Sequence, residues 1–229
     1  MKDVANLEKK IGIKFKDKEL LRQSLVHRSY LNEHKDFELD HNERMEFLGD
    51  AVLELVTTEF LYNNFSNPEG ELTNFRAALV NRKMLAIIST EIGLEEYLLM
   101  SKGESKDTGR ARQYIIANAL EAVIGAIYLD QGYGKSKKFI KDYFLCKMND
   151  VLSDKLYQDA KSKFQEEAQE KVGITPCYKV IKEWGPDHDK HFLIGIFLDE
   201  EKIAEGEGIS KQVAQRNAAK KGLEVKGWE

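Results

Sequence analysis

The sequence contains little cysteine and no long apolar run. Only two cysteines, Cys146 and Cys177, occur among its 229 residues, and they do not have a metal-binding spacing. We therefore expect reduced thiols, no disulfide and a reducing, cytoplasmic compartment. No apolar run is long enough to span a bilayer, and the first ten residues, MKDVANLEKK, lack the apolar segment of a secretory signal. The sequence thus predicts a protein without membrane association.

Excess positive charge is also missing. The formal net charge is −4 and the isoelectric point is about 5.9, which argues against a simple polycationic nucleic-acid binder. Any affinity for nucleic acid must then come from local basic patches. None of the five histidines belongs to an evident catalytic triad, so we expect neither a His nor a Cys nucleophile and no small-molecule cofactor.

The periodicity of apolar residues divides the chain near residue 153. From Leu7 to about Leu152 they recur at helical spacing, with turn signals at 67–70, 103–109 and 132–134 and no convincing strand. This predicts an all-α N-terminal domain over residues 1–152, followed by a short linker at 153–157. The polar stretch 101–112 is expected to be a loop, either near the substrate or simply solvated.

The pattern of the remaining residues, 158–229, predicts a small α+β domain. A helix is expected at 159–172 with Asp159 as its cap, followed by strands at 178–184, 191–198 and 203–207. Residues 199–202 form the expected hairpin turn, and Ser210 is expected to cap a final helix. The predicted order is α-β-β-β-α.

Three carboxylates in the segment 42–54, NERMEFLGDAVLE, are the main candidates for chemistry. Glu43, Glu46 and Asp50 are spaced i, i+3 and i+7, so they lie on one face of a helix. Like charges at this spacing repel, and a hard divalent cation relieves that repulsion. The alternative is the ordinary solvated face of a half-buried helix.

A second segment, IIANALEAVIGAIYL at 115–129, is apolar nearly all round and therefore predicts a buried helix. Asn118 and Glu121 share a face of it at spacing i, i+3. A Glu in such a helix is costly unless it is protonated, paired or bound to a metal. The two segments together predict a metal site between helices; the alternative for Glu121 is a buried ion pair with a Lys or Arg.

The same segments carry a family resemblance. ERMEFLGDAV at 43–52 resembles the signature of ribonuclease III, and LVHRSY at 25–30, PEGELT at 68–73 and ANALEA at 117–122 resemble other blocks of that family. The resemblance implies a homodimeric endoribonuclease that cuts both strands of double-stranded RNA and leaves short 3′ overhangs. It also implies Mg²⁺ as the cofactor, with Mn²⁺ as a substitute, and a role in processing rRNA and mRNA.

The resemblance also implies the roles of individual residues. Asp50 and Glu121 take catalytic roles, Glu46, Asp50, Asn118 and Glu121 hold the metal, and Glu43 and Glu69 are outer members of the acidic cluster. Asn118 departs from the family pattern, which has Asp there. An amide oxygen can still ligate Mg²⁺ or hold a ligated water; the alternative is an inactive site.

The C-terminal part resembles a double-stranded RNA-binding domain. The likeness depends on GEGISK at 206–211 and on Ala214, Ala218 and Ala219 in the final helix. Basic residues at a helix N-terminus suit phosphate binding. By resemblance the residues that contact RNA are Gln165, His188, Lys211, Gln212 and Lys220, although the family has a second Lys where Gln212 stands.

Two other functions are compatible with these motifs. One is a duplex-RNA-binding protein whose site Asn118 has inactivated. The other is a helical phosphohydrolase that acts on small nucleotides, for which a duplex-binding C-terminal domain would have no use.

Overall fold

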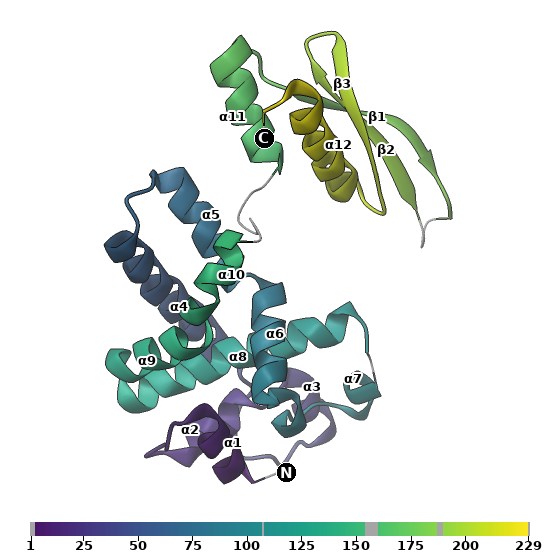
Figure 1. Ribbon diagram of the computed structural model, residues 1–229. Helices are drawn as coiled ribbons and strands as arrows, with labels where there is room; N and C mark the ends of the chain where they lie inside the picture. Colours follow the sequence, from purple (N-terminus) through teal and green to yellow (C-terminus); the bar gives the residue numbers. More distant parts are fainter. Residues whose placement is uncertain (1–2, 107, 154–159, 187–189, 229) are drawn as a thin grey trace. The chain divides into compact units, whose positions relative to one another are not determined.

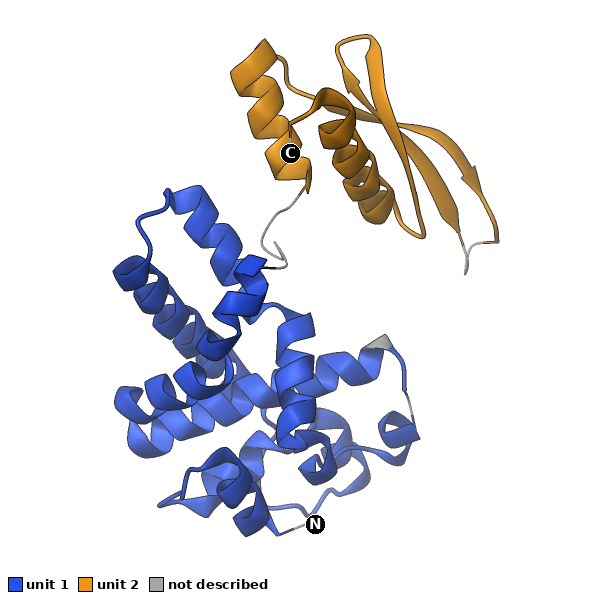
Figure 2. Cartoon of the chain, in the orientation of Figure 1, with its two compact units in different colours: residues 1–157 blue, residues 158–229 orange. Residues whose placement is uncertain are grey.

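A computed structural model describes residues 3–106, 108–153, 160–186 and 190–228. The chain divides into two compact units, unit 1 (Met1–Tyr157) and unit 2 (Gln158–Glu229), shown in Figure 2. Ser153, the first residue of the predicted linker, ends a helix of unit 1, and the rest of that linker, 154–157, lies outside the described residues.

In its described part, unit 1 is built from helices, as predicted, with one isolated bridge between Val26 and Leu99 (Figure 1). Its elements are α1 (Val4–Ile11), α2 (Lys18–Ser24), α3 (Arg28–Glu33), α4 (Glu43–Asn64), α5 (Glu69–Val80), α6 (Arg82–Ile92), η1 (Leu94–Tyr97), α7 (Lys102–Lys106), α8 (Arg110–Gln131), α9 (Tyr133–Tyr143), η2 (Leu145–Lys147) and α10 (Met148–Ser153).

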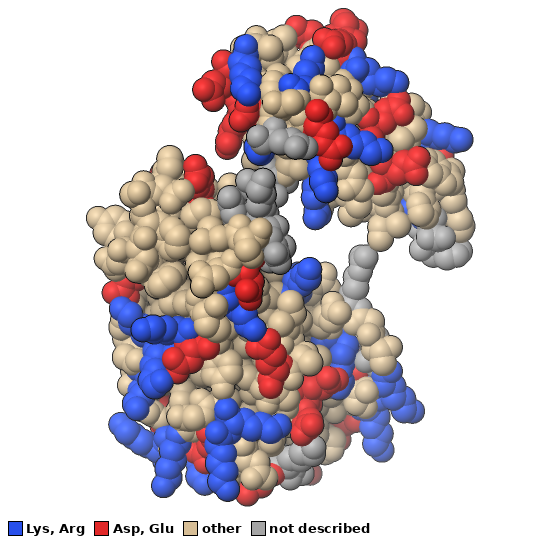
Figure 3. Space-filling view, viewed as in Figure 1, with Lys and Arg blue, Asp and Glu red and all other residues tan. Residues whose placement is uncertain are grey.

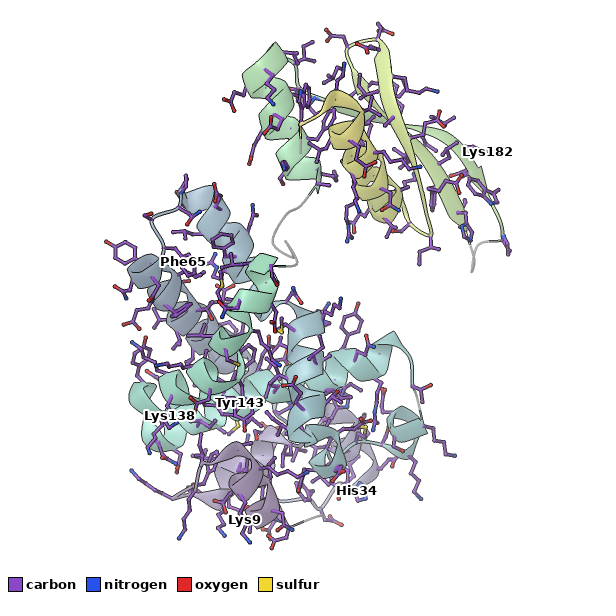
Figure 4. The ribbon with its side chains drawn as sticks, viewed as in Figure 1. Lys9, His34, Phe65, Lys138, Tyr143 and Lys182 are labelled. Carbon is purple, nitrogen blue, oxygen red and sulfur yellow. The ribbon has the colours of Figure 1, made fainter. Side chains whose placement is uncertain are left out.

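Helix α8 lies in the core of unit 1. Residues 122–127 are buried, which confirms the prediction of a buried helix, and α8 packs most extensively against α4. Helices α4 and α5 are joined by an aromatic cluster, in which the ring of Phe65 lies 6.1 Å from that of Phe60 and 5.6 Å from that of Phe75 (Figure 4). These contacts hold α5 against the end of α4.

Helix α6 has clear signals at both ends. The side chain of Asn81 accepts a hydrogen bond from the Met84 N–H, which caps the first turn. Gly93 ends the helix with a φ of 69°, a left-handed conformation that glycine adopts without steric cost. The N-terminus of α6 is therefore held in a fixed place.

The predicted loop at 101–112 is partly wrong. Lys102–Lys106 forms the short helix α7, and α8 begins at Arg110. Arg112 is held by Glu95, with 2.7 Å between its Nη2 and the carboxylate, and it donates to the Glu104 carbonyl. These polar partners order residues whose composition alone indicated a loop.

Unit 2 has the predicted order α-β-β-β-α: α11 (Ala160–Val172), β1 (Cys177–Trp184), β2 (His191–Leu198), β3 (Glu201–Gly208) and α12 (Lys211–Lys226). The sheet is antiparallel in the order β1-β2-β3, with Tyr178 opposite Ile196 and Ile196 opposite Ala204. The third strand is longer than predicted because its pairing with β2 continues to both ends. Ser210 caps α12 as expected; the predicted cap Asp159 lies outside the described residues.

Helix α12 lies directly on β3. A Cβ on Gly206 would lie 2.1 Å from the Ala218 nitrogen and 2.4 Å from the Ala214 carbonyl oxygen. The glycine and both alanines therefore let the helix approach the strand, and Phe164, Leu223 and Trp228 complete the core. Close packing explains why this motif needs small residues.

Both cysteines are free and exposed. Over the described residues, no helix has the length and apolarity that crossing a membrane requires.

Candidate functional site

Two glycines bring helices α4 and α8 into contact. A Cβ on Gly49 would lie 1.7 Å from the Glu121 carbonyl oxygen, and one on Gly125 would lie 2.3 Å from the Met45 carbonyl oxygen. Any side chain at either position would clash with backbone. The helices thus approach closely at the point where each carries its acidic residues.

A cavity of about 510 Å³ opens at this crossing. It is lined by Glu43, Glu46, Phe47, Asp50, Val80, Arg82, Leu85, Ala117, Asn118 and Glu121, and we call it the acidic cavity. Five of the residues singled out from the sequence line it: Glu43, Glu46, Asp50, Asn118 and Glu121. They come from two helices that are far apart in the chain, α4 and α8.

The carboxylates perturb one another in this cavity. Burial, together with the nearby charges of Asp50 and Glu46, raises the pKa of Glu121 to about 8, and Arg82 acts in the opposite direction. Burial also raises the pKa of Glu46, with Glu43 and Asp50 adding to the shift. The Asn118 side chain donates a hydrogen bond to Glu46, which acts in the opposite direction. The half-buried acids therefore carry a cost that a cation would remove.

The structure argues against two alternatives for these acids, a solvated helix face for those of α4 and a buried ion pair for Glu121. Glu46 and Glu121 are half-buried in the cavity, which a plain solvated face would not produce. Within the described chain, no Lys or Arg forms an ion pair with Glu121. Arg82 affects its pKa only from a distance.

Glu43 lies at the rim of the cavity. Arg28 Nη1 is 3.5 Å from one of its carboxylate oxygens, and His41 Nδ1 is 3.7 Å from the other. These groups hold Glu43 toward its basic neighbours, so its position fits an outer, supporting member of the cluster.

Glu69 is not brought to the acidic cavity. It lines a separate hollow of about 410 Å³ together with Thr58, Leu61, Tyr62, Leu72, Thr73 and Arg76, which we call the α4–α5 hollow. A single chain therefore does not gather all the acidic residues that the resemblance groups together, because Glu69 begins α5 and lines the α4–α5 hollow instead.

The donor set of the acidic cavity fits a hard divalent cation. Glu46, Asp50 and Glu121 offer carboxylate oxygens and Asn118 an amide oxygen, and no sulfur or imidazole lines the cavity. Among the described residues, no three acidic, His or Cys side chains lie close enough together to hold a metal ion. The carboxylates line an open cavity instead.

Sequence reasoning missed three contributors to this site. Gly49 and Gly125 form the helix crossing, and a glycine inside an apolar helix is the available signal for such a close approach. Arg82 lines the cavity from α6, and no pattern in the sequence connects it with the acids.

Unit 2 carries the predicted RNA-contacting residues on its two helices. Gln165 is exposed on α11, and Lys211, Gln212 and Lys220 are exposed on α12. Lys211 is the first residue of α12, and its Nζ lies 5.7 Å from the centre of the Phe192 ring on β2. His188 lies outside the described residues.

Comparison with known proteins finds a family match for each of the two units. The family described as Ribonuclease-III-like matches residues 17–148, and the Double-stranded RNA binding motif matches residues 160–226. The chain is 42% identical to Ribonuclease 3 of Enterococcus faecalis over 218 residues, 95% of this chain and 94% of that protein. It is 40% identical to Ribonuclease 3 of Nitratiruptor sp., covering 98% and 97% of the two chains.

Solved structures are similar as well. The nuclease domain of ribonuclease III from Campylobacter jejuni superposes with a TM-score of 0.56 at 40% identity. That match covers 62% of this chain and 99% of the other.

Proposed function

The chain belongs to the ribonuclease III family of double-strand-specific endoribonucleases, and we propose that its acidic cavity is the site of hydrolysis. The observation that carries this proposal is the convergence of Glu46, Asp50, Asn118 and Glu121 on one cavity. We assign the nuclease activity to unit 1 and a contribution to duplex binding to unit 2.

The residues of the cavity would hold Mg²⁺, with Mn²⁺ as a substitute, through Glu46, Asp50, Asn118 and Glu121. When bound, such a cation activates water and stabilises negative charge on the phosphate and the leaving oxygen. The chain itself supplies Asp50, an exposed carboxylate that can accept a hydrogen bond from water at the mouth of the cavity. Glu121 takes the second catalytic role, deeper in the same cavity.

The hydrogen bond from Asn118 positions Glu46. It fixes the orientation of the carboxylate and leaves the amide oxygen of Asn118 as the group that can face a cation. The substitution of Asn for the family's Asp is therefore compatible with an active site of lower negative charge.

A homodimer is the second part of the proposal. Phe47 is 81% exposed beside the acidic cavity, and Tyr62 is 79% exposed beside the α4–α5 hollow. The visible surface over α4 and α5 carries few charged groups (Figure 3). Exposed aromatics on such a sparsely charged surface favour a self-complementary interface, in which Phe47 of each copy enters the hollow of the other. Glu69 lines that hollow, so a second copy would carry it toward the acidic cavity. The related C. jejuni domain also has a region involved in dimer formation.

Each copy in such a dimer would cut one strand, leaving the short 3′ overhangs of the family. Duplex RNA is recognised mainly through phosphates and 2′-hydroxyls across its minor groove, so shape matters more than sequence. Gln165, His188, Lys211, Gln212 and Lys220 are the proposed contacts in unit 2, and processing of rRNA and mRNA precursors is the proposed role.

The test is a cleavage assay on labelled duplex and single-stranded RNA. We expect the parent protein to cut only the duplex, with Mg²⁺ or Mn²⁺, and to stop in chelator. Glu121→Gln is expected to bind the duplex without cutting it. A Glu121→Gln protein that cuts at the parent's rate would disprove the proposed site, and binding without cleavage by the parent would favour the inactivated duplex binder.

A further inference from the structure

Arg82 is the one cationic side chain that lines the acidic cavity in the described part of the chain. It is the first residue of α6, whose N-terminus Asn81 caps. Its guanidinium carbon lies 3.9 Å from the centre of the Tyr114 ring, a close stacking contact. Over the described residues, the Arg82 side chain makes no ion pair and no hydrogen bond.

This arrangement is unusual for an arginine among carboxylates. Arg82 is close enough to lower the pKa of both Glu46 and Glu121. A guanidinium within reach of a carboxylate normally forms a two-pronged hydrogen-bonded pair. Here the side chain stacks on an aromatic face instead, which leaves its five N–H donors free at the edge of the guanidinium plane.

The ring under Arg82 belongs to the active face of α8. Tyr114, Asn118 and Glu121 are spaced i, i+4 and i+7, so they share one side of the helix. Arg82 is exposed and Tyr114 is 43% exposed, so this stacked pair is accessible from solvent. Tyr114 thus holds Arg82 about one helical turn from Asn118 and two turns from Glu121.

A polyanionic substrate must enter a cavity whose other charged groups are acids. A phosphate that approaches Glu46, Asp50 and Glu121 is repelled unless cations lie on its path. The planar fork of a guanidinium matches phosphate oxygens, and a helix N-terminus adds a favourable dipole on the same side. Arg82 has the charge, the free donors and the position to meet such a phosphate.

We propose that Arg82, held on the Tyr114 ring, binds a backbone phosphate of the duplex at the mouth of the acidic cavity. The inference depends on the proposed catalytic role of that cavity. The alternative is that Arg82 is an internal counter-charge. In that role it reduces the repulsion between the carboxylates of the cavity and does not contact RNA.

The two roles give different results in the full-length protein. For a phosphate contact, we expect Arg82→Ala to lower kcat/KM by about tenfold or more. The salt dependence of duplex binding should flatten by roughly one unit of slope. Arg82→Lys should recover part of the loss, because a point charge replaces the fork. The Mg²⁺ concentration for half-maximal cleavage should stay within about twofold of the parent's, because Arg82 does not hold the cation.

Lys83→Ala is the matched control. Lys83 is the next residue, exposed on the same helix, and it does not line the cavity. The Lys83→Ala variant should have the same kcat/KM and the same salt dependence of duplex binding as the parent. An effect as large as that of Arg82→Ala would mean that general charge on α6 is responsible, and this would overturn the inference.

Tyr114 acts through Arg82, so a double-mutant cycle tests its positioning role. Tyr114→Leu should lower kcat/KM in the parent and have little further effect in the Arg82→Ala background. Additive losses would show that the two residues work separately, against the proposal. Thermal unfolding of each variant identifies any loss that comes from misfolding.

Two outcomes refute the inference outright. One is Arg82→Ala with unchanged kcat/KM and salt slope; the other is Arg82→Ala whose only change is tighter Mg²⁺ binding, as the counter-charge role requires. Glu121→Gln, measured in parallel, separates this failure from failure of the site itself. If Glu121→Gln cuts normally, the cavity is not catalytic, whatever Arg82 does.

Discussion

The Asn118 side chain donates a hydrogen bond to the carboxylate of Glu46 and so joins α8 to α4 inside the acidic cavity. An ionised Asp at this position has no donor, so it would repel Glu46 where Asn holds it. The departure from the family pattern thus exchanges one negative charge for a bond between the helices.

Asn118→Asp tests this exchange. We expect tighter Mg²⁺ binding and a lower metal concentration for half-maximal cleavage, because the site gains a carboxylate. The metal-free variant should unfold at a lower temperature than the parent, since it loses the bond to Glu46 and gains repulsion. Mg²⁺ should raise its Tm more than the parent's, because a ligand of the folded state stabilises by mass action. Superimposable metal titrations of the two proteins would remove Asn118 from the ligand set.

Gly49→Ala tests the helix crossing. The new methyl group would lie 1.7 Å from the Glu121 carbonyl oxygen, so the helices must separate. Overpacking typically costs about 1–3 kcal/mol, and a clash with backbone belongs at the upper end. We expect a lower Tm and severe loss of duplex cleavage, because Glu46 and Asp50 move away from Asn118 and Glu121.

Gly70→Ala is the control for that variant. Gly70 lies in α5, and a Cβ there meets nothing within 4 Å. Because Ala favours helices over Gly by up to about 1 kcal/mol, stability should be equal or slightly higher. A Gly49→Ala protein as stable and active as Gly70→Ala would show that the close crossing does not position the site.

The raised pKa of Glu121 predicts how the stability of the metal-free protein depends on pH. The folded protein holds this proton up to a pKa of about 8, whereas the usual pKa of a free Glu side chain is 4.5. Between these values the unfolded chain is ionised and the folded one is not, so stability falls as pH rises through this window. Glu121→Gln lacks the titrating group. In chelator it should match the parent near pH 4.5 and become more stable than the parent toward pH 8.

Urea denaturation at both ends of that pH window checks this expectation. A Glu121→Gln protein that is less stable at every pH would instead indicate a buried ionic partner for Glu121.

Local patterns predicted the elements and most of the acidic cavity. The spacing of Glu43, Glu46 and Asp50 puts them on one face of α4, and the apolar surroundings of Glu121 mark α8 as buried. Both follow from helical periodicity, which is a property of neighbouring residues. The capping of α12 by Ser210 is equally local.

Contacts between distant elements could not be predicted in this way. Arg82 reaches the cavity because α6 packs against α8, and its stacking on Tyr114 joins residues 32 positions apart in sequence. Glu69 lies in a different hollow, although its motif suggested the acidic cluster. The loop assigned to 101–112 was partly wrong because Arg112 finds Glu95 and the Glu104 carbonyl. In all three cases the position of a residue depends on tertiary contacts that the local sequence pattern does not contain.

Phe47→Asp tests the proposed homodimer. A charge on this 81% exposed position would have to enter the α4–α5 hollow of a second copy, at a cost of several kcal/mol. We expect the variant to be monomeric by sedimentation and to lose double-strand cleavage, with its Tm changed little because Phe47 is not packed in its own chain. Leu55→Asp is the control, because Leu55 is an exposed apolar residue of the same helix that lines neither the acidic cavity nor the α4–α5 hollow. It shows whether a charge added anywhere on the exposed side of α4 is enough to break the dimer. A dimeric Phe47→Asp protein would contradict the proposed interface.

Lys211→Ala tests the RNA-binding role of unit 2. Lys211 is exposed at the N-terminus of α12, where its charge and the helix dipole favour the same phosphate. Removing it should weaken binding to duplexes of any sequence and flatten the salt dependence by roughly one unit of slope. Lys226→Ala is the control, since Lys226 ends the same helix and pairs with Glu201 at 3.3 Å. Fluorescence anisotropy over a range of salt concentrations measures both. Equal slopes for Lys211→Ala and the parent would mean that α12 does not meet the backbone through Lys211, and duplex affinity would then reside in unit 1.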